Sequence, residues 1–146
     1  MVKIRLMKEE DVPEVLDISA LFYKETDYPF TYSSKGWEAT VRQFLAPSIV
    51  AVDGDVVVGV LVLAIVSGLW NHTEKLATEI CFYIREPYRN ADIGKRMIEK
   101  AEMISQIYGA TSVTMASAAG KRDAVFNRYY SRLGYKKTEI AYTKEI

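Results

Sequence analysis

Residues 79–100 decide how this chain is organised, and they read Glu-Ile-Cys-Phe-Tyr-Ile-Arg-Glu-Pro-Tyr-Arg-Asn-Ala-Asp-Ile-Gly-Lys-Arg-Met-Ile-Glu-Lys. The apolar and aromatic run at Ile80–Ile84 is too short for a core helix and predicts a strand. Pro87, Asn90 and Asp92 then favour a tight loop. The stretch therefore predicts a strand, a loop and the start of a helix.

The helix after this loop is predicted from the spacing of its apolar residues. They recur at helical intervals up to Gly109, a candidate C-cap, and they are Ile93, Met97, Ile98, Ala101, Ile104 and Tyr108. A helix that begins in such a loop presents unpaired N–H groups and the positive end of its dipole. This arrangement is typical of a phosphate or pyrophosphate site.

The segment Tyr88–Ile98 resembles the acyl-CoA signature of the GNAT superfamily of N-acetyltransferases, Arg/Gln-x-x-Gly-x-Gly/Ala after a strand, and Arg89 and Gly94 match it. The resemblance implies that backbone amides of residues 90–95 wrap the pyrophosphate of acetyl-CoA. It also implies that the strand edge at residues 82–84 pairs with the pantetheine arm. The cofactor-binding residues implied in this way are Phe82, Tyr83, Ile84, Arg89, Asn90, Ala91, Asp92, Ile93, Gly94 and Lys95.

Asp92 stands where the family usually has glycine. Its Cβ predicts backbone strain at a position that favours glycine, and its carboxylate predicts repulsion of the phosphates. Aspartate tolerates a left-handed backbone better than most residues, and solvent screens an outward carboxylate. We therefore expect pyrophosphate binding that is weakened rather than lost.

The composition is that of an ordinary globular domain. The 146 residues are 49% hydrophobic and 26% charged, which favours one domain over residues 1–146. Lys plus Arg and Asp plus Glu number 19 each, so no global charge favours nucleic acid or a membrane surface as partner. One cysteine and one histidine leave neither an internal disulfide nor a zinc cluster, and we expect no metal. With no signal peptide and no run of membrane-spanning length, we expect a soluble, cytoplasmic protein.

Periodicity along the rest of the chain predicts an α/β fold. The predicted elements are a strand at 2–6, helices at 12–25 and 37–45, strands at 48–52, 56–67 and 75–85, a helix at 94–108, a strand at 112–116, a helix at 123–133 and a final strand at 135–144. Asp11 and Glu14 form a candidate capping box, and Asp53-Gly54 predicts a hairpin turn. We expect a mixed, mostly antiparallel sheet flanked by about four helices, which matches the GNAT layout.

A second stretch, Tyr129–Tyr135, resembles the Tyr-x-x-x-Gly-Phe/Tyr ending of the last helix in this superfamily. The resemblance puts Tyr130 at the position of the general acid. A phenol there protonates the CoA thiolate as it leaves the thioester. The alternative is that Tyr130 is a core aromatic at helical spacing from Phe126.

Glu79 is the candidate general base, because an amine is protonated at neutral pH and must lose a proton before it attacks a thioester. Thr78–Phe82 resembles the start of the same strand in relatives that use a glutamate, and desolvation in an apolar strand raises a carboxyl pKa. The alternatives are an exposed glutamate on the solvent face of the strand, a structural ion pair, and a proton relay through water. His72 is more often a surface residue in such a loop than a base, and Cys81 is expected to be an inert core thiol.

Two further groups of residues are candidates for substrate contacts. An acidic and aromatic cluster recognises a cationic amine or packs a long connection over the core; it comprises Glu25, Asp27, Tyr28, Phe30, Tyr32 and Trp37. A basic group meets the CoA 3′-phosphate or forms a solvated helix face; it comprises Lys121, Arg122, Arg128 and Arg132. The solvated face is the favoured interpretation.

The sequence as a whole predicts an acetyl-CoA-dependent N-acetyltransferase that acts by direct attack of a bound amine in a ternary complex. The alternatives are a catalytically silent acyl-CoA-binding or protein-interaction module and a transferase for longer acyl groups. The acceptor is a small-molecule or peptide amine, with polyamine, amino acid, aminoglycoside, peptide N-terminus and protein lysine all open. A homodimer is a family-level expectation only.

Overall fold

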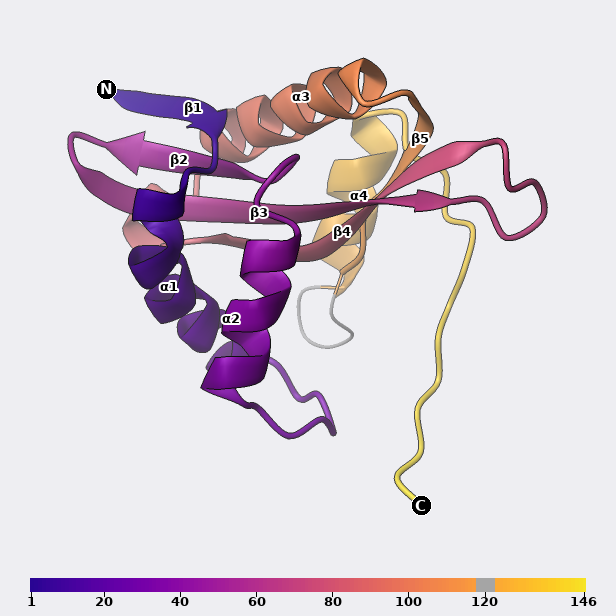
Figure 1. The fold of residues 1–146 in the computed structure, drawn as a ribbon, viewed down its shortest axis with the longest axis horizontal. Coiled ribbons are helices and arrows are strands. Elements are labelled where there is room, and N and C mark those ends of the chain that lie inside the picture. Colours follow the sequence, from indigo (N-terminus) through magenta and orange to yellow (C-terminus); the bar gives the residue numbers. More distant parts are fainter. Residues whose placement is uncertain (118–122) are drawn as a thin grey trace.

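A computed structural model describes residues 1–117 and 123–146, which form a five-stranded sheet with helices on both faces (Figure 1). The strands are β1 (Val2–Leu6), β2 (Ile49–Asp53), β3 (Val56–Ser67), β4 (Lys75–Ile84) and β5 (Ala110–Thr114). They lie in the order β1-β2-β3-β4-β5, and all neighbours are antiparallel except β4 and β5, which are parallel. This confirms the mixed, mostly antiparallel sheet that the sequence predicted.

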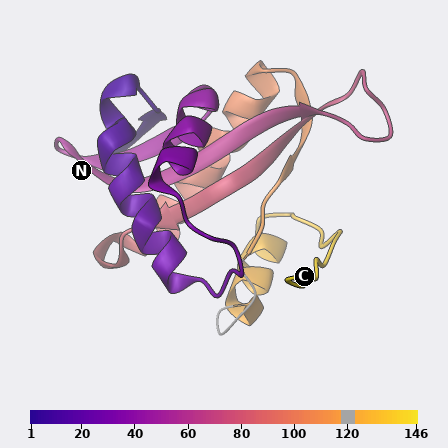
Figure 2. The ribbon, with the colours of Figure 1, turned by 60° about the horizontal axis from the view of Figure 1, so that its bottom comes forward.

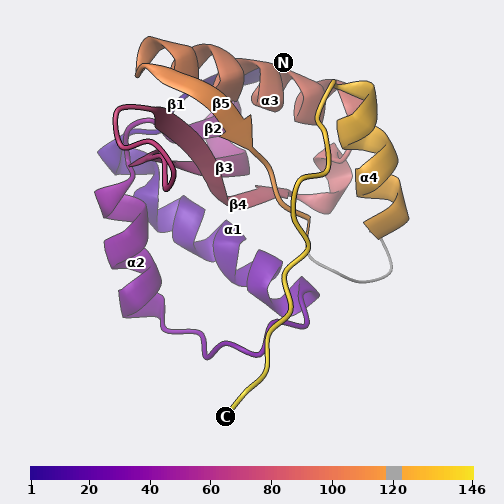
Figure 3. The same ribbon diagram turned by 90° about the vertical axis from the view of Figure 1, so that its right-hand side faces the viewer.

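The helices form a layer on each face of the sheet. They are α1 (Val12–Glu25), α2 (Ser34–Gln43), α3 (Ala91–Ile107) and α4 (Asp123–Arg132), with short 3-10 turns at Glu9–Asp11 and Glu86–Tyr88. Apolar residues of α1 and α2 are buried against one face, and those of α3 against the other (Figures 2 and 3). Among the described helices, none is long and apolar enough to cross a membrane.

The β2–β3 hairpin follows the sequence prediction. Gly54 takes φ = 61° in its turn, a left-handed backbone that glycine adopts without steric cost. β3 is buried on both faces because it runs through the centre of the sheet: Val62 belongs to the core under α1, and Leu61 and Leu63 belong to the core under α3.

The capping box predicted at the first helix is wrong. The Asp11 carboxylate accepts hydrogen bonds from the Arg5 guanidinium at 2.6 and 2.8 Å and from the Lys8 amide at 2.8 Å, rather than from α1. Glu14 accepts from the Val57 amide at 2.9 Å. Both carboxylates tie the start of α1 to other elements, which a local pattern does not reveal because the partners are distant in sequence.

The final strand predicted at 135–144 is also wrong. Residues 136–146 are exposed and leave the body of the protein as an irregular tail (Figure 3). Strand-forming side chains gain stability only from a pairing partner and a face to bury. Within the described part of the chain, no strand pairs with this tail, and the outer edge of β5 has no partner.

Element boundaries elsewhere differ from the predictions by a few residues. α2 begins at Ser34 rather than at residue 37, because the Ser33 hydroxyl accepts a hydrogen bond from the Gly36 amide at 3.1 Å and caps the helix. β5 spans Ala110–Thr114 rather than 112–116. The loop predicted at 117–120 falls mostly outside the described residues.

Candidate active site

The pairing of β4 changes halfway along its length. Residues 75–78 pair with both β3 and β5, whereas residues 79–84 pair with β3 alone among the described strands. β5 ends at Thr114, and the chain beyond it diverges from β4 (Figure 2). The second half of β4 therefore presents an open backbone edge.

The hydrogen-bond pattern of β4 shows which of its residues turn their backbone N–H and C=O groups toward the open edge. The Arg85 amide donates to the Val58 carbonyl at 2.8 Å, so Arg85 faces β3. Because antiparallel pairing alternates along a strand, Phe82 and Ile84 turn their backbone groups toward the open edge. Arg89 Nε already donates to the Ile84 carbonyl at 2.8 Å. The assignment of this edge to the pantetheine arm stays a prediction.

Arg89, which matches the family signature, is held by contacts within the protein. Its Nη2 lies 2.8 Å from Oε2 of Glu25, and its guanidinium lies 4.8 Å from the centre of the Tyr83 ring. The Tyr83 hydroxyl donates to the same Glu25 carboxylate at 2.5 Å. Arg89 thus fastens the end of β4 to the end of α1, which fixes the start of the loop in space.

The loop ends in the N-terminus of α3, three residues earlier than the sequence predicted. The Asn90 side chain accepts a hydrogen bond from the Ile93 amide at 3.0 Å and caps the helix. The amides of residues 91 and 92 precede the first intrahelical hydrogen bond, so they lie where a helix binds an anion.

The strain expected at Asp92 is absent. Asp92 lies in the first turn of α3, and among the described residues only glycines have a positive φ. Its carboxylate lies 3.2 Å from Arg96 one turn later, and its side chain is 71% exposed. Its remaining effect on a bound pyrophosphate is therefore a screened repulsion. Lys95 in the same turn lies 3.6 Å from Glu99.

Gly94 is required by packing between two helices rather than by its backbone conformation. A Cβ at this position would lie 3.0 Å from the hydroxyl oxygen of Tyr129 on α4. That hydroxyl is buried and has no hydrogen-bond partner among the described residues. The close approach places the middle of α4 over the first turn of α3, and thereby places Tyr130, the next residue, at the end of the open edge.

Glu79 and Tyr130 meet in one small cavity, which we name the reaction cavity. Its volume is about 110 Å³, and it is lined by Phe22, Tyr28, Glu79, Ile80, Phe82, Ala116, Ser117, Phe126 and Tyr130. The Ala116 amide donates to Oε2 of Glu79 at 2.9 Å, and the Ala116 carbonyl accepts a long hydrogen bond from the Tyr130 hydroxyl at 3.4 Å. The two candidate catalytic groups, which are 51 positions apart in the sequence (130 − 79), therefore converge on a single residue.

A bulge in β4 helps to aim Glu79 into this cavity. Cys81 pairs with Val62 and Glu79 pairs with Leu63, so Ile80 has no partner of its own on β3. In a regular strand, neighbouring residues point to opposite faces, but a bulge re-aims them. Glu79 and Ile80 consequently line the same cavity.

The electrostatics of the reaction cavity suit a base and an acid. Burial raises the pKa of Glu79 to about 7, although hydrogen bonds from the backbone of Ala116 and Phe82 oppose this. Burial and the nearby charge of Glu79 raise the pKa of Tyr130 well above its usual value. At neutral pH a substantial share of Glu79 is ionised, whereas Tyr130 keeps its proton.

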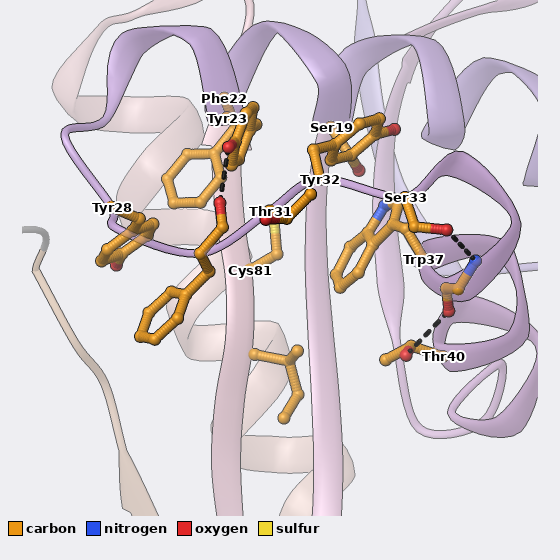
Figure 4. A pocket seen from close by; sticks show the side chains of 13 residues that line it. Ser19, Phe22, Tyr23, Tyr28, Thr31, Tyr32, Ser33, Trp37, Thr40 and Cys81 are labelled. Atoms are coloured by element: carbon orange, nitrogen blue, oxygen red, sulfur yellow. Dashed lines mark hydrogen bonds between the residues drawn. The ribbon is translucent and has the colours of Figure 1, made fainter. Parts of the chain in front are cut away.

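A second, larger cavity adjoins the reaction cavity, and we name it the aromatic pocket. Its volume is about 350 Å³, and its aromatic lining consists of Phe22, Tyr23, Tyr28, Phe30, Tyr32 and Trp37. Figure 4 shows Phe22 and Tyr28 at one side of the pocket and Trp37 and Thr40 at the other, with Cys81 between them. The two cavities share Phe22, Tyr28 and Ile80 as lining residues. Burial and the charge of Glu79 raise the pKa of Tyr28, which places this side chain at their junction.

The structure divides the acidic and aromatic cluster that the sequence grouped together. Tyr28, Phe30, Tyr32 and Trp37 line the aromatic pocket, but Glu25 and Asp27 do not. The helix predicted at 12–25 includes Phe22, but the sequence did not reveal that this residue lies between the two cavities. The helical spacing marks such a residue as buried, but it does not show what the residue lies against.

Two other residues that the sequence singled out for possible chemistry, His72 and Cys81, do not act in this site. One lies away from both cavities, and the other is chemically inert. His72 is exposed and lines neither cavity. Cys81 is buried in the aromatic pocket, and burial raises the pKa of its thiol far above the usual value, so it stays protonated. Lys121 and Arg122 lie outside the described residues. Within the described residues, no cluster of His, Cys, Asp or Glu is arranged to hold a metal ion.

A mixed sheet with one half-open strand, whose open edge leads to a helix N-terminus, defines the GNAT type of acyltransferase fold. The sequence matches the Acetyltransferase (GNAT) family over residues 12–135, so the chain belongs to this family. No curated protein matches the chain significantly.

Solved structures match the fold over its whole length at low identity. A transcriptional regulator from Bacillus halodurans C-125 has a TM-score of 0.77 and 20% identity over 100% of both chains. A predicted acetyltransferase with acetyl-CoA from Clostridium acetobutylicum has a TM-score of 0.78 and 13% identity over 99% of this chain and 96% of its own. AAC(6')-Iy in complex with the bisubstrate analogue CoA-S-monomethyl-acetylneamine has a TM-score of 0.76 and 15% identity over 100% of this chain and 99% of its own. These likenesses concern the fold.

Proposed function

We propose that this protein transfers an acetyl group from acetyl-CoA to a primary amine by direct attack in a ternary complex. The observation that carries the proposal is the convergence of Glu79 and Tyr130 on Ala116, inside one cavity at the end of the open β4 edge. Membership of the GNAT acetyltransferase family supports acetyl transfer as the class of reaction.

The residues along the open edge fit acetyl-CoA as the donor. The free amides at the start of α3 lie at one end of this edge and suit a pyrophosphate. The backbone of Phe82 and Ile84 suits the amides of a pantetheine arm, and the reaction cavity at the other end suits the thioester. Structures of similar fold contain acetyl-CoA or a CoA bisubstrate analogue, which supports this donor.

Glu79 and Tyr130 have complementary roles in this proposal. Bound acetyl-CoA supplies a thioester carbonyl and a thiolate leaving group. Glu79 accepts a proton from the ammonium group of the acceptor, so that the nitrogen lone pair is free to form the new C–N bond. Tyr130 donates its proton to the sulfur as the C–S bond breaks, and the second nitrogen proton leaves to solvent, which reprotonates Tyr130. A phenol that keeps its proton at neutral pH is suited to this role.

The proposal is tested by the Tyr130→Phe variant, with Tyr142→Phe in the exposed tail as its matched control. Titration calorimetry measures acetyl-CoA binding, and release of the CoA thiol in the presence of an amine panel measures turnover. Tyr130→Phe should lower kcat about 10- to 100-fold, because a thiolate leaves more readily than most groups that need an acid. Its acetyl-CoA affinity should stay close to that of the unaltered protein.

Two outcomes would contradict the proposal. Acetyl-CoA binding without acetylation of any amine would favour a catalytically silent acyl-CoA-binding module. No acetyl-CoA binding would remove the donor assignment altogether. Equal turnover by Tyr130→Phe and Tyr142→Phe would remove the acid role of Tyr130 and leave the class of reaction intact.

A further inference from the structure

Among the described residues, no charged side chain lines the aromatic pocket. Its lining residues are Ser19, Phe22, Tyr23, Tyr28, Phe30, Thr31, Tyr32, Ser33, Gly36, Trp37, Thr40, Ile80 and Cys81, all within the described part of the chain. A cation buried without an opposite charge loses its hydration without compensation. Within its described lining, the pocket therefore offers a further positive charge only the faces of its rings and no carboxylate.

Glu25 and Asp27 lie close in the sequence to aromatic residues of the pocket, but neither supplies it with a negative charge. Glu25 accepts hydrogen bonds from both the Arg89 guanidinium and the Tyr83 hydroxyl, and it does not line the pocket. Asp27 does not line the pocket. Among the side chains that the structure describes, Glu79 is the one carboxylate that lines either cavity, and it lies in the reaction cavity, where the attacking amine has to arrive.

Two hydroxyl groups that line the pocket already donate to backbone carbonyls. The Tyr23 hydroxyl donates to the Phe30 carbonyl at 2.6 Å, and the Ser19 hydroxyl donates to the Val15 carbonyl at 2.7 Å. Nε1 of Trp37 is buried and has no hydrogen-bond partner among the described residues. Because this atom is closed off from solvent, it is not a donor toward a molecule in the pocket.

The rings of the pocket are arranged as aromatic surfaces that accept another ring. The Phe22 and Tyr28 rings meet edge to face, with centroids 6.3 Å apart, and Tyr28 and Phe30 are tilted at 5.8 Å. Edge-to-face and offset contacts of this kind favour an added aromatic ring over an aliphatic chain. A volume of about 350 Å³ is at the small end of ligand pockets, so it suits one ring with a short arm.

We infer that the aromatic pocket binds the acceptor through a small uncharged aromatic ring, whose single primary amine extends past Phe22, Tyr28 and Ile80 toward Glu79. This inference rests on the proposed function and narrows its acceptor class from primary amines in general to arylalkyl monoamines. Polyamines and aminoglycosides are then poor acceptors, because their additional ammonium groups have no carboxylate in the pocket.

Binding is measured through Trp37, independently of turnover. The chain has two tryptophans, and Trp70 is 96% exposed in a connection between strands, so Trp70→Phe leaves Trp37 as the single tryptophan, which light of about 295 nm excites without the tyrosines. The probes are 2-phenylethylamine, 2-phenylethanol, which lacks the amine, and spermidine. Saturable fluorescence changes with both phenyl compounds and none with spermidine are expected. Absence of a response to the phenyl compounds, or an equal response to spermidine, would overturn the inference.

Turnover is measured with the same amines and acetyl-CoA. The kcat/KM for 2-phenylethylamine should exceed that for spermidine at least about 10-fold, as expected for an uncompensated buried charge. Phenyl compounds that bind without acetylation would keep the pocket assignment and contradict the proposed function. Efficient acetylation of spermidine in preference to 2-phenylethylamine would keep the proposed function and contradict this inference.

A carboxylate added to the pocket should weaken the preference for 2-phenylethylamine over spermidine. Thr31→Asp introduces a carboxylate of nearly the same shape at the exposed rim of the pocket, and Thr31→Asn is the matched uncharged control. The Asp variant should raise kcat/KM for spermidine about 10-fold relative to the Asn variant, since a close opposite charge is worth about 1 kcal/mol or more. Equal selectivity of the two variants would contradict the inference.

Discussion

The reaction cavity and the aromatic pocket share three lining side chains, yet they are built for different tasks. The reaction cavity is small and holds the titratable pair Glu79 and Tyr130. The aromatic pocket has about three times its volume and no charged side chain among its lining residues. The first is assembled from β4, the chain after β5 and α4, whereas the second is assembled mainly from α1, α2 and the chain between them.

In this arrangement, the residues that would bind the acceptor and the residues that would transfer protons come from different parts of the sequence. Substitutions between about residues 19 and 40 should alter which acceptor binds and leave the acid and base in place. Substitutions at Glu79 or Tyr130 should alter the rate with every acceptor. Kinetic measurements distinguish the two, because loss of uniform binding raises KM and loss of a transition-state interaction lowers kcat.

The largest effect is expected for Glu79→Gln in the reaction cavity. Loss of the base should lower kcat/KM at least about 100-fold near neutral pH. Because the pKa of Glu79 is about 7 and the base form is required, activity of the unaltered protein should rise as pH increases through 7. Glu139→Gln in the exposed tail is the control. An unchanged pH profile in Glu79→Gln would indicate a water relay to another base.

The same variant carries a stability prediction of known sign. The folded pKa of Glu79 lies above its ordinary value of 4.5, so the folded state holds a proton that the unfolded state releases between pH 4.5 and 7. Glu79 should therefore destabilise the protein increasingly as pH rises through this window, by about 3 kcal/mol. Denaturation of Glu79→Gln at pH 5 and pH 8 should show a smaller pH dependence than the unaltered protein.

A smaller effect is expected for Trp37→Leu in the aromatic pocket. Loss of the indole ring should raise KM for 2-phenylethylamine about 10-fold, through lost ring contacts and apolar burial. The kcat should change less than about twofold, because Trp37 lines the aromatic pocket and not the reaction cavity. A fall in kcat with an unchanged KM would contradict the separation of the two cavities.

The start of α3 lies outside both cavities, so a substitution there should act chiefly on donor binding. Gly94→Ala forces its Cβ against the Tyr129 hydroxyl, so acetyl-CoA binding should weaken about fivefold as the helices shift. In a Tyr129→Phe background the same substitution should cost less, because the contacted oxygen is gone. A double-mutant cycle by calorimetry measures this coupling, and purely additive effects would exclude the Gly94–Tyr129 contact as the cause.

The smallest effect is expected for Asp92→Asn at the same helix terminus. Removal of the carboxylate should tighten acetyl-CoA binding by less than about threefold, because the charge is exposed and paired with Arg96. Asparagine is preferred to glycine here, since glycine would also lower helix stability. Tightening of more than about 10-fold at physiological salt would mean that the carboxylate faces the phosphates directly.

Local patterns were sufficient for most of the fold. The hairpin turn at Asp53-Gly54 and the helical spacing of residues 93–108 depend on interactions between near neighbours, so the sequence predicts them. The final strand failed for the opposite reason. Alternation at residues 135–144 shows that this segment is able to pair, but only a neighbouring strand decides whether it does.

The sequence named the candidate base and acid of the site, but it did not predict which other residue brings them together. Glu79 and Tyr130 are recognisable from their flanking residues, whereas Ala116, on which both converge, has no distinguishing neighbour pattern. Glu25 looked like part of an amine-binding cluster because it is close to Tyr28 in the sequence. Its actual partner, Arg89, is 64 positions away.

The sequence by itself determined the elements, the family resemblance and the identity of the acid and base candidates, because these depend on spacing within short segments. Tertiary structure alone decided that β5 stops pairing beyond Thr78 of β4, which opens the strand edge and brings Ala116 beside Glu79. It also decided that the aromatic pocket is left without a carboxylate, since Glu25 turns to Arg89. Both outcomes depend on contacts between residues far apart in the chain, which only the folded protein brings together.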